Sequence, residues 1–123
     1  DNMKTDELGK WGEDLATQHL SAAGYAIVER NWRVDHFEVD IVAMKNGRIV
    51  FVEVKTRSDK DGDPLEAVNR KKILNLVRSA NAYVKMFDIP HEIQFDVITV
   101  SGTQADYSIE HLPDAFEPPL KTY

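Results

Sequence analysis

The sequence predicts a single α/β domain whose elements follow the order α-β-β-β-α-β-β, with helices flanking one β-sheet. Residues 6–23 and 63–85 carry apolar residues at the three-and-four spacing of amphipathic helices. Shorter runs rich in Val, Ile, Phe and Tyr predict strands at 25–30, 38–43, 49–57, 92–100 and 107–112. The length of 123 residues suits one hydrophobic core, so 1–123 is expected to be one domain with flexible ends at 1–5 and 117–123.

The first helix is expected over residues 6–23, and Gly24 is a typical C-terminal stop. At about 100° per residue, Glu13 lies at the rim of the apolar arc, whereas Asp14 lies almost opposite it. Glu13 can therefore reach a site beside the core, while Asp14 is expected to face water. The alternative for Glu13 is an ordinary carboxylate in the first half of a helix. His19 lies within the arc and is interpreted as a packed core residue.

The first strand is expected at residues 25–30, closed by a turn at residues 31–33. Trp32 in this turn could stack on a nucleic acid base, but a buried anchor is the more common role of a tryptophan. In the strand at 92–100, the acid Asp96 lies between the apolar neighbours Phe95 and Val97. It is interpreted as structural, with a direct catalytic role as the alternative, and Phe116 is expected to dock the proline-rich tail.

The dipeptide Asn46-Gly47 is the strongest local signal for a β-hairpin. With these two residues as the loop, Lys45 pairs with Arg48, and counting outward places Asp40 directly opposite Glu53. Directly opposed residues have Cβ atoms about 4.5–5.5 Å apart. Two carboxylates at that separation repel each other unless a proton or a cation lies between them. The register therefore predicts a site for a hard divalent cation.

The strand after the hairpin, residues 49–57, alternates its side chains between two faces. One face, with Val50, Val52 and Val54, is expected to be core. The other is expected to carry chemistry through Glu53, Lys55 and Arg57. The same register sets Glu38 opposite Lys55, where it is expected to hold the lysine in place.

The second helix is expected to begin with Asp63 as N-cap, Pro64 at the first helical position and Glu66 in a capping arrangement, and to run to about Lys85. It follows the Glu53 strand and its polar loop directly. This placement favours a binding role for the cations near its start, although a solvated helix face is the usual reason for such a cluster. The residues assigned to nucleic acid binding are Arg57, Lys60, Arg70, Lys71 and Lys72.

The charge distribution bears on partners more than the total does. The net charge of −6 argues against nucleic acid, because phosphates call for Lys and Arg. Residues 45–78, however, hold nine Lys or Arg against five Asp or Glu, a local balance of +4. One basic face on an acidic body would give this asymmetry, and so would a weak binder.

Several classes of protein are disfavoured by composition. The chain has no Cys, and its four His lack paired ligand spacing, so disulfides and a zinc site are not expected. No apolar run approaches the roughly 20 residues needed to span a bilayer, and no basic-then-apolar leader opens the chain. We therefore expect no membrane association and a cytoplasmic location.

Asp40 followed by Glu53-Val54-Lys55 resembles the PD-(D/E)XK nuclease signature. In a wider set of segments the chain resembles the YraN-like family, small bacterial proteins related in fold to Holliday junction resolvases. One departure is Phe37, where that family usually has glycine. The segments that carry the resemblance are Gly9-Lys10-Trp11-Gly12-Glu13, Glu38-Val39-Asp40, Phe51-Val52-Glu53-Val54-Lys55-Thr56-Arg57, Glu66-Ala67-Val68-Asn69-Arg70-Lys71-Lys72, Phe95-Asp96-Val97-Ile98 and His111-Leu112-Pro113-Asp114-Ala115-Phe116.

The resemblance implies a restriction-endonuclease-like fold, with a mixed sheet between helices. It implies a Mg- or Mn-dependent endonuclease acting on DNA, with branched DNA as a candidate substrate, and a homodimer as in resolvase-like relatives. Asp40 and Glu53 are assigned as metal ligands, since Mg²⁺ needs only one or two carboxylates. By resemblance, the Val54 carbonyl is a third ligand, and Glu13 belongs to the active site, where it would complete the metal shell. Lys55 would orient the water or stabilise the transition state.

Two alternatives remain open at this point. The first is a non-catalytic nucleic-acid-binding or adaptor protein on the same fold; the intact set of acids favours the nuclease over it. The second concerns the acids alone, which could belong to a cross-strand ladder of ion pairs.

Overall fold

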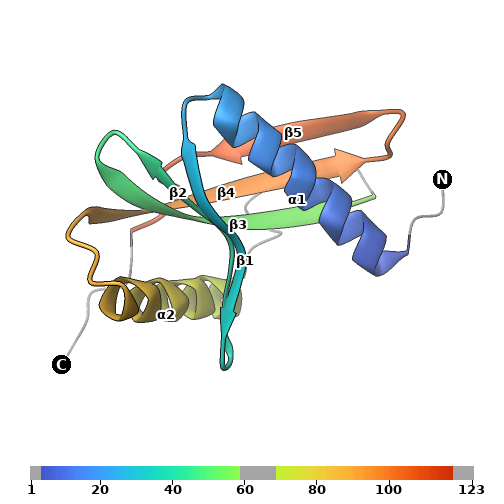
Figure 1. Ribbon diagram of the computed structural model, residues 1–123. Coiled ribbons are helices and arrows are strands. Elements are labelled where there is room, and N and C mark those ends of the chain that lie inside the picture. Colours follow the sequence, from blue (N-terminus) through green and yellow to red (C-terminus); the bar gives the residue numbers. More distant parts are fainter. Residues whose placement is uncertain (1–3, 59–68, 118–123) are drawn as a thin grey trace.

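The computed structural model describes residues 4–58 and 69–117 (Figure 1). In this part of the chain the elements follow the predicted order. They are α1 Thr5–Ala22, β1 Ala26–Val34, β2 Phe37–Lys45, β3 Arg48–Arg57, α2 Arg70–Met86, β4 Glu92–Gly102 and β5 Tyr107–Leu112. None of the described helices is long and apolar enough to cross a membrane.

The strands form one mixed sheet in the order β1-β2-β3-β4-β5. Only the β3–β4 pair is parallel among the described pairs, because α2 connects these two strands as a crossover; the others are antiparallel. The two helices cover opposite faces of the sheet, as Figure 1 shows.

Each face of the sheet carries its own hydrophobic core. On the α1 face, Ala16 and Leu20 pack with Val50, Val52 and other strand residues. On the α2 face, Leu76, Ala80 and Tyr83 pack with Ile49, Phe51 and others. The expectation that one face of β3 is core and the other carries chemistry is therefore wrong for its first half. Only from Glu53 onward does the second face line an open cleft.

The hairpin register is confirmed from Lys45–Arg48 to Ile41–Val52. Asn46 and Gly47 have φ values of 51° and 76°, the left-handed conformation that a tight two-residue hairpin loop requires. Gly24, with φ 90°, follows the end of α1 as expected.

The turn predicted at residues 31–33 is wrong, because β1 continues through it to Val34. Asn31 does adopt a left-handed φ of 53°, but pairing with β2 resumes at Trp32–Val39. Trp32 is the buried anchor that was expected: it is 5% exposed and its ring lies edge-on to Tyr83. Packing of this side chain under α2 overrides the local turn propensity.

Among the described residues, the second helix spans Arg70–Met86. Asn69 has an extended backbone, and its side chain accepts a hydrogen bond from the Lys72 N–H at 2.9 Å, so Asn69 is the N-cap. The predicted start at Asp63–Glu66 lies outside the described residues. Phe116 docks as predicted, with its ring stacked on that of Phe95 at 5.1 Å between centroids.

A polar cluster joins α1 to β5 and β4 through His19, His111 and Asp96. His19 is half-buried rather than packed in the core, and its Nε2 lies 3.1 Å from Nδ1 of His111. Asp96 is fully buried. Its carboxylate accepts hydrogen bonds from four donors: Tyr25 Oη, Gln94 Nε2, His111 Nε2 and the Asp114 N–H.

Candidate active site

A cleft of about 780 Å³ lies beside the sheet, between the N-terminal half of α1 and the first turn of α2. It brings together the four residues that were predicted to be catalytic: Glu13, Asp40, Glu53 and Lys55. The full lining is Thr5, Asp6, Leu8, Gly9, Lys10, Glu13, Asp14, Arg30, Asn31, Arg33, Glu38, Asp40, Glu53, Val54, Lys55, Thr56 and Lys72.

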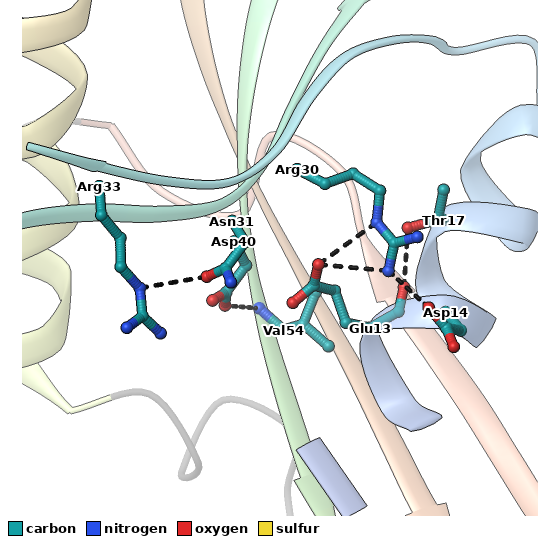
Figure 2. Close-up of polar contacts among 8 residues, drawn as sticks. All are labelled: Glu13, Asp14, Thr17, Arg30, Asn31, Arg33, Asp40 and Val54. Atoms are coloured by element: carbon teal, nitrogen blue, oxygen red, sulfur yellow. Dashed lines mark hydrogen bonds and ion pairs between the residues drawn. The ribbon is translucent and has the colours of Figure 1, made fainter. Parts of the chain in front are cut away.

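The cleft opens where β2 separates from β3. The described backbone pairing of these strands ends at Ile41–Val52, one step short of the predicted Asp40–Glu53 pair. Here the Asp40 side chain takes the place of a strand partner, because its Oδ2 accepts a 2.8 Å hydrogen bond from the Val54 N–H (Figure 2). The two carboxylates lie in one cleft, as the sequence predicted, but not through an unbroken ladder.

The predicted partner of Glu38 is wrong. The register pairs Glu38 with Arg33 of β1, and the Arg33 Nε lies 3.8 Å from the Glu38 carboxylate. The described β2–β3 pairing does not extend to Lys55. Glu38 therefore sits on the β1 wall of the cleft, where its charge acts on Asp40 and Glu53 through space.

Nearby cations compensate the two central carboxylates only in part. Burial, reinforced by the charges of Glu13 and Glu38, raises the pKa of Asp40 to about 6, although the Val54 N–H opposes the shift. Burial and then the charge of Asp40 raise the pKa of Glu53 to about 7. The Glu53 side chain is 19% exposed, and Lys72 Nζ lies 4.0 Å away. The cleft therefore favours a proton or a cation.

Glu13 reaches the cleft because α1 packs closely on β3. Gly12 permits this approach, since a Cβ at this position would overlap the Thr56 side chain. Arg30 of β1 then bridges the two acids of the helix, with its Nη2 3.2 Å from Glu13 and 2.6 Å from Asp14. In Figure 2 the Glu13 carboxylate lies between Arg30 and the Asp40–Val54 bond. Asp14 faces solvent as expected, with 43% of its side chain exposed, and pairs there with Arg30.

The cations assigned to nucleic acid binding separate into two groups. Lys72 lines the cleft, whereas Arg70 and Lys71 lie exposed on the first turn of α2 outside the lining. Arg57 donates a 3.1 Å hydrogen bond to Ser101 of β4. Lys60 lies outside the described residues.

Three cations of the cleft were missed from sequence: Lys10, Arg30 and Arg33. Arg30 was expected at the end of a strand and Arg33 in the turn after it, but both belong to β1, which forms a wall of the cleft. A signal was present, since Arg30 and Arg33 lie on either side of the anchoring Trp32. Arg33 is held by Asn31, whose Oδ1 accepts from Arg33 Nε at 3.2 Å.

Asp96 does not belong to this cleft. It is absent from the lining, and its hydrogen bonds beyond β4 tie this strand to Tyr25, to His111 of β5 and to Asp114 after β5. The structural interpretation is therefore favoured over the catalytic alternative.

The donor set suits a hard cation better than a preformed metal cage. No cluster of three or more His, Cys, Asp or Glu side chains among the described residues has metal-binding geometry. Asp40 and Glu53 nevertheless offer carboxylate oxygens in one cleft, with charge that Lys72 neutralises only in part. Mg²⁺ and Mn²⁺ prefer oxygen ligands and keep several waters, so such a pair is compatible with them.

Comparison with protein families places the chain among proteins of unknown activity. The model of the "Uncharacterised protein family UPF0102" matches residues 12–100. A UPF0102 protein of Bacteroides fragilis is 51% identical over 114 residues, which cover 92% of this chain and 94% of that protein. A UPF0102 protein of Flavobacterium johnsoniae is 46% identical over 116 residues, covering 90% and 94% of the two chains.

Among solved structures, the chain is similar to a repair endonuclease from Pyrococcus abyssi, with a TM-score of 0.51 and 16% sequence identity. The match covers 85% of this chain but 41% of the endonuclease, so this chain spans less than half of that protein. The likeness, together with the element order, shows a restriction-endonuclease-like α/β fold.

Proposed function

The chain belongs to the uncharacterised protein family UPF0102, and we propose that it is a metal-dependent endonuclease that hydrolyses DNA phosphodiesters. The observation that carries the proposal is the Asp40–Glu53 pair, which is held in an open cleft with raised pKa values and no sufficient cation of its own. The fold of a repair endonuclease and the match to the PD-(D/E)XK signature support the same reading.

The proposed roles follow from position. Asp40 and Glu53 would hold Mg²⁺ or Mn²⁺, with the Val54 carbonyl as a further ligand and Glu13 beside them. A bound divalent ion supplies charge neutralisation on the phosphate and lowers the pKa of an attacking water. Lys55, on the same face of β3 as Glu53, orients that water or stabilises the charge that develops on the phosphate.

The walls of the cleft provide the contacts to the DNA backbone. Arg33 is 63% exposed at the mouth and has only the distant Glu38 carboxylate as an ionic partner among the described residues. Phosphate recognition by such Arg and Lys side chains gives affinity without sequence preference. The lining holds five Lys or Arg against six Asp or Glu, so a divalent cation on the acids would be needed to make the cleft favourable to a phosphate backbone.

The proposal is tested by incubating the protein with labelled single-stranded, duplex, flap and four-way-junction DNA in Mn²⁺, Mg²⁺ or EDTA. Asp40→Asn is the test variant, since asparagine can still accept the Val54 hydrogen bond. Glu29→Gln is the matched control, because Glu29 accepts from Tyr83 Oη at 3.2 Å and does not line the cleft.

We expect metal-dependent cutting by the wild type and the control, with cutting lost in Asp40→Asn. Binding of DNA without cutting, unchanged by Asp40→Asn, would replace the nuclease proposal by the non-catalytic binding alternative. The panel also identifies whether branched DNA is preferred.

A further inference from the structure

Lys72 stands at the mouth of the cleft with its side chain toward the carboxylates. It lies in the first turn of α2, where the Asn69 cap fixes its backbone N–H at 2.9 Å. Its Nζ is 4.0 Å from Glu53 Oε2, and it lines the cleft together with Asp40. Its neighbours Arg70 and Lys71 point away to solvent.

The ion pair between Lys72 and Glu53 is a loose one. A separation of 4.0 Å is at the outer limit of an ion pair, and the Lys72 side chain is 43% exposed. Exposed pairs of this kind add little stability, and a lysine is a point charge on a flexible four-carbon stem. Lys72 can therefore leave Glu53 at small cost.

A divalent cation and Lys72 compete for the negative charge of the Asp40 and Glu53 carboxylates. A cation held by Asp40 and Glu53 would lie within a few ångströms of the present Lys72 ammonium, and two cations at that distance repel each other. The lysine would have to swing outward, and the open cleft in that direction is where a DNA backbone is proposed to lie.

We infer that Lys72 is an exchangeable counter-ion, which pairs with Glu53 in the metal-free protein and moves to a substrate phosphate when a divalent cation binds. The inference rests on the proposed function. Lys72 then lowers the affinity for the metal but raises the affinity for DNA once the metal is bound. Metal and DNA affinities are thereby linked through one side chain.

The test combines two titrations of the intact protein. Calorimetry measures Mn²⁺ binding without DNA, and fluorescence anisotropy measures binding of a labelled four-way junction in Mn²⁺ and in EDTA. A denaturing gel verifies the uncut fraction after each anisotropy titration. The variants are Lys72→Met, Lys72→Arg and, as the matched neighbour, Lys71→Met, with melting temperatures to verify folding.

For Lys72→Met we expect Mn²⁺ to bind about 3- to 10-fold more tightly, because a repelling unit charge is removed. The gain in DNA affinity that Mn²⁺ gives the wild type should shrink by about the same factor. Lys72→Arg should behave like the wild type, and Lys71→Met should leave Mn²⁺ affinity unchanged.

Unchanged or weaker Mn²⁺ binding in Lys72→Met would overturn the inference while leaving the proposed function standing. An equal rise in Lys71→Met would also overturn it, by showing a general charge effect. If millimolar Mn²⁺ does not bind the wild type at all, the proposed metal site itself fails, and the inference fails with it.

Discussion

At the scale of single residues, the site is built from charge that the fold does not neutralise. Asp40 and Glu53 are both half-buried, and burial raises the pKa of each. The charge of Asp40 adds to the shift of Glu53, and the charges of Glu13 and Glu38 add to that of Asp40. Such a pair lowers the free energy of unfolding of the metal-free protein. A destabilising pair of this kind is typical of a functional site rather than of a packed core.

The first prediction concerns stability against pH in EDTA. Because the pKa values of Asp40 and Glu53 are raised by folding, the folded state binds more protons than the unfolded state. The contribution of these two groups to the free energy of unfolding therefore falls as pH rises from the ordinary carboxyl range to neutrality. Asp40→Asn removes one charge, so we expect it to be more stable than the wild type at pH 8 by on the order of 1–2 kcal/mol, and by less at pH 5.

Urea denaturation at the two pH values measures this difference. The comparison with wild type matters, because burial lowers the pKa of His19, which acts in the opposite direction in both proteins. Glu29→Gln should show no such gain at pH 8. An Asp40→Asn protein that is equally destabilised at both pH values would contradict the assignment of unneutralised charge.

At the scale of elements, the position of α1 against β3 decides whether Glu13 reaches the site. The two glycines of Gly9-Lys10-Trp11-Gly12-Glu13 differ sharply in this respect. A Cβ at Gly12 would overlap Thr56, whereas a Cβ at Gly9 has open space around it.

The second prediction follows from this contrast. Gly12→Ala should destabilise the protein by about 1–3 kcal/mol, because extra volume at a close contact forces the helix away from the strand. Gly9→Ala should be neutral or stabilising by up to about 1 kcal/mol, because alanine is the better helix former. Thermal denaturation of the two variants side by side measures the difference, and equal effects would contradict the packing account.

A second element-scale device fixes the segment after β5. His111 and the Asp114 N–H both donate to the buried Asp96, and the Ala115 N–H donates to the Phe95 carbonyl at 2.8 Å. Burial alone would raise the pKa of Asp96, but the hydrogen bonds from His111, Gln94 and Asp114 outweigh it and hold the pKa low. These hydrogen bonds thus hold the segment around Asp96 and the segment that begins at His111 together.

The third prediction is that Asp96→Asn costs about 2–4 kcal/mol, because an amide cannot accept from four donors and places an N–H₂ group against them. Glu110→Gln, on the exposed side of β5, should be near neutral. Since the pKa of Asp96 is lowered, the stability it gives is present above the ordinary carboxyl range. It should be lost as pH falls through the lowered value, a slope that the variant should lack in acid denaturation.

At the scale of the whole molecule, the element order and hairpin register could be predicted because their signals are local. Asn46-Gly47 sets the register, and counting from it identified Asp40 and Glu53 as neighbours. The count assumed an unbroken ladder, so it could not foresee that β2 leaves β3 at Asp40. That separation depends on a side chain replacing a backbone partner, which no alternation of residues reveals.

The remaining errors share a cause. A turn was predicted at residues 31–33, and Asn31 does adopt a left-handed backbone there. The packing of Trp32 under α2 nevertheless continues the strand, so Arg30 and Arg33 of β1 were missed as residues of the cleft. His19 followed the apolar arc of α1, but its partner His111 is 92 residues away in sequence. Both features depend on tertiary contacts that local patterns do not contain.

The measurement that tests the nuclease proposal most directly is the single-turnover cleavage rate of a labelled four-way junction in Mn²⁺, for the wild type and Glu53→Gln. We expect the wild type to cut in Mn²⁺ and not in EDTA. The variant should be slower by on the order of 100-fold or more, as for loss of a group that organises transition-state charge. A wild type that leaves every DNA of the panel intact, or a variant that cuts at the same rate, would contradict the account.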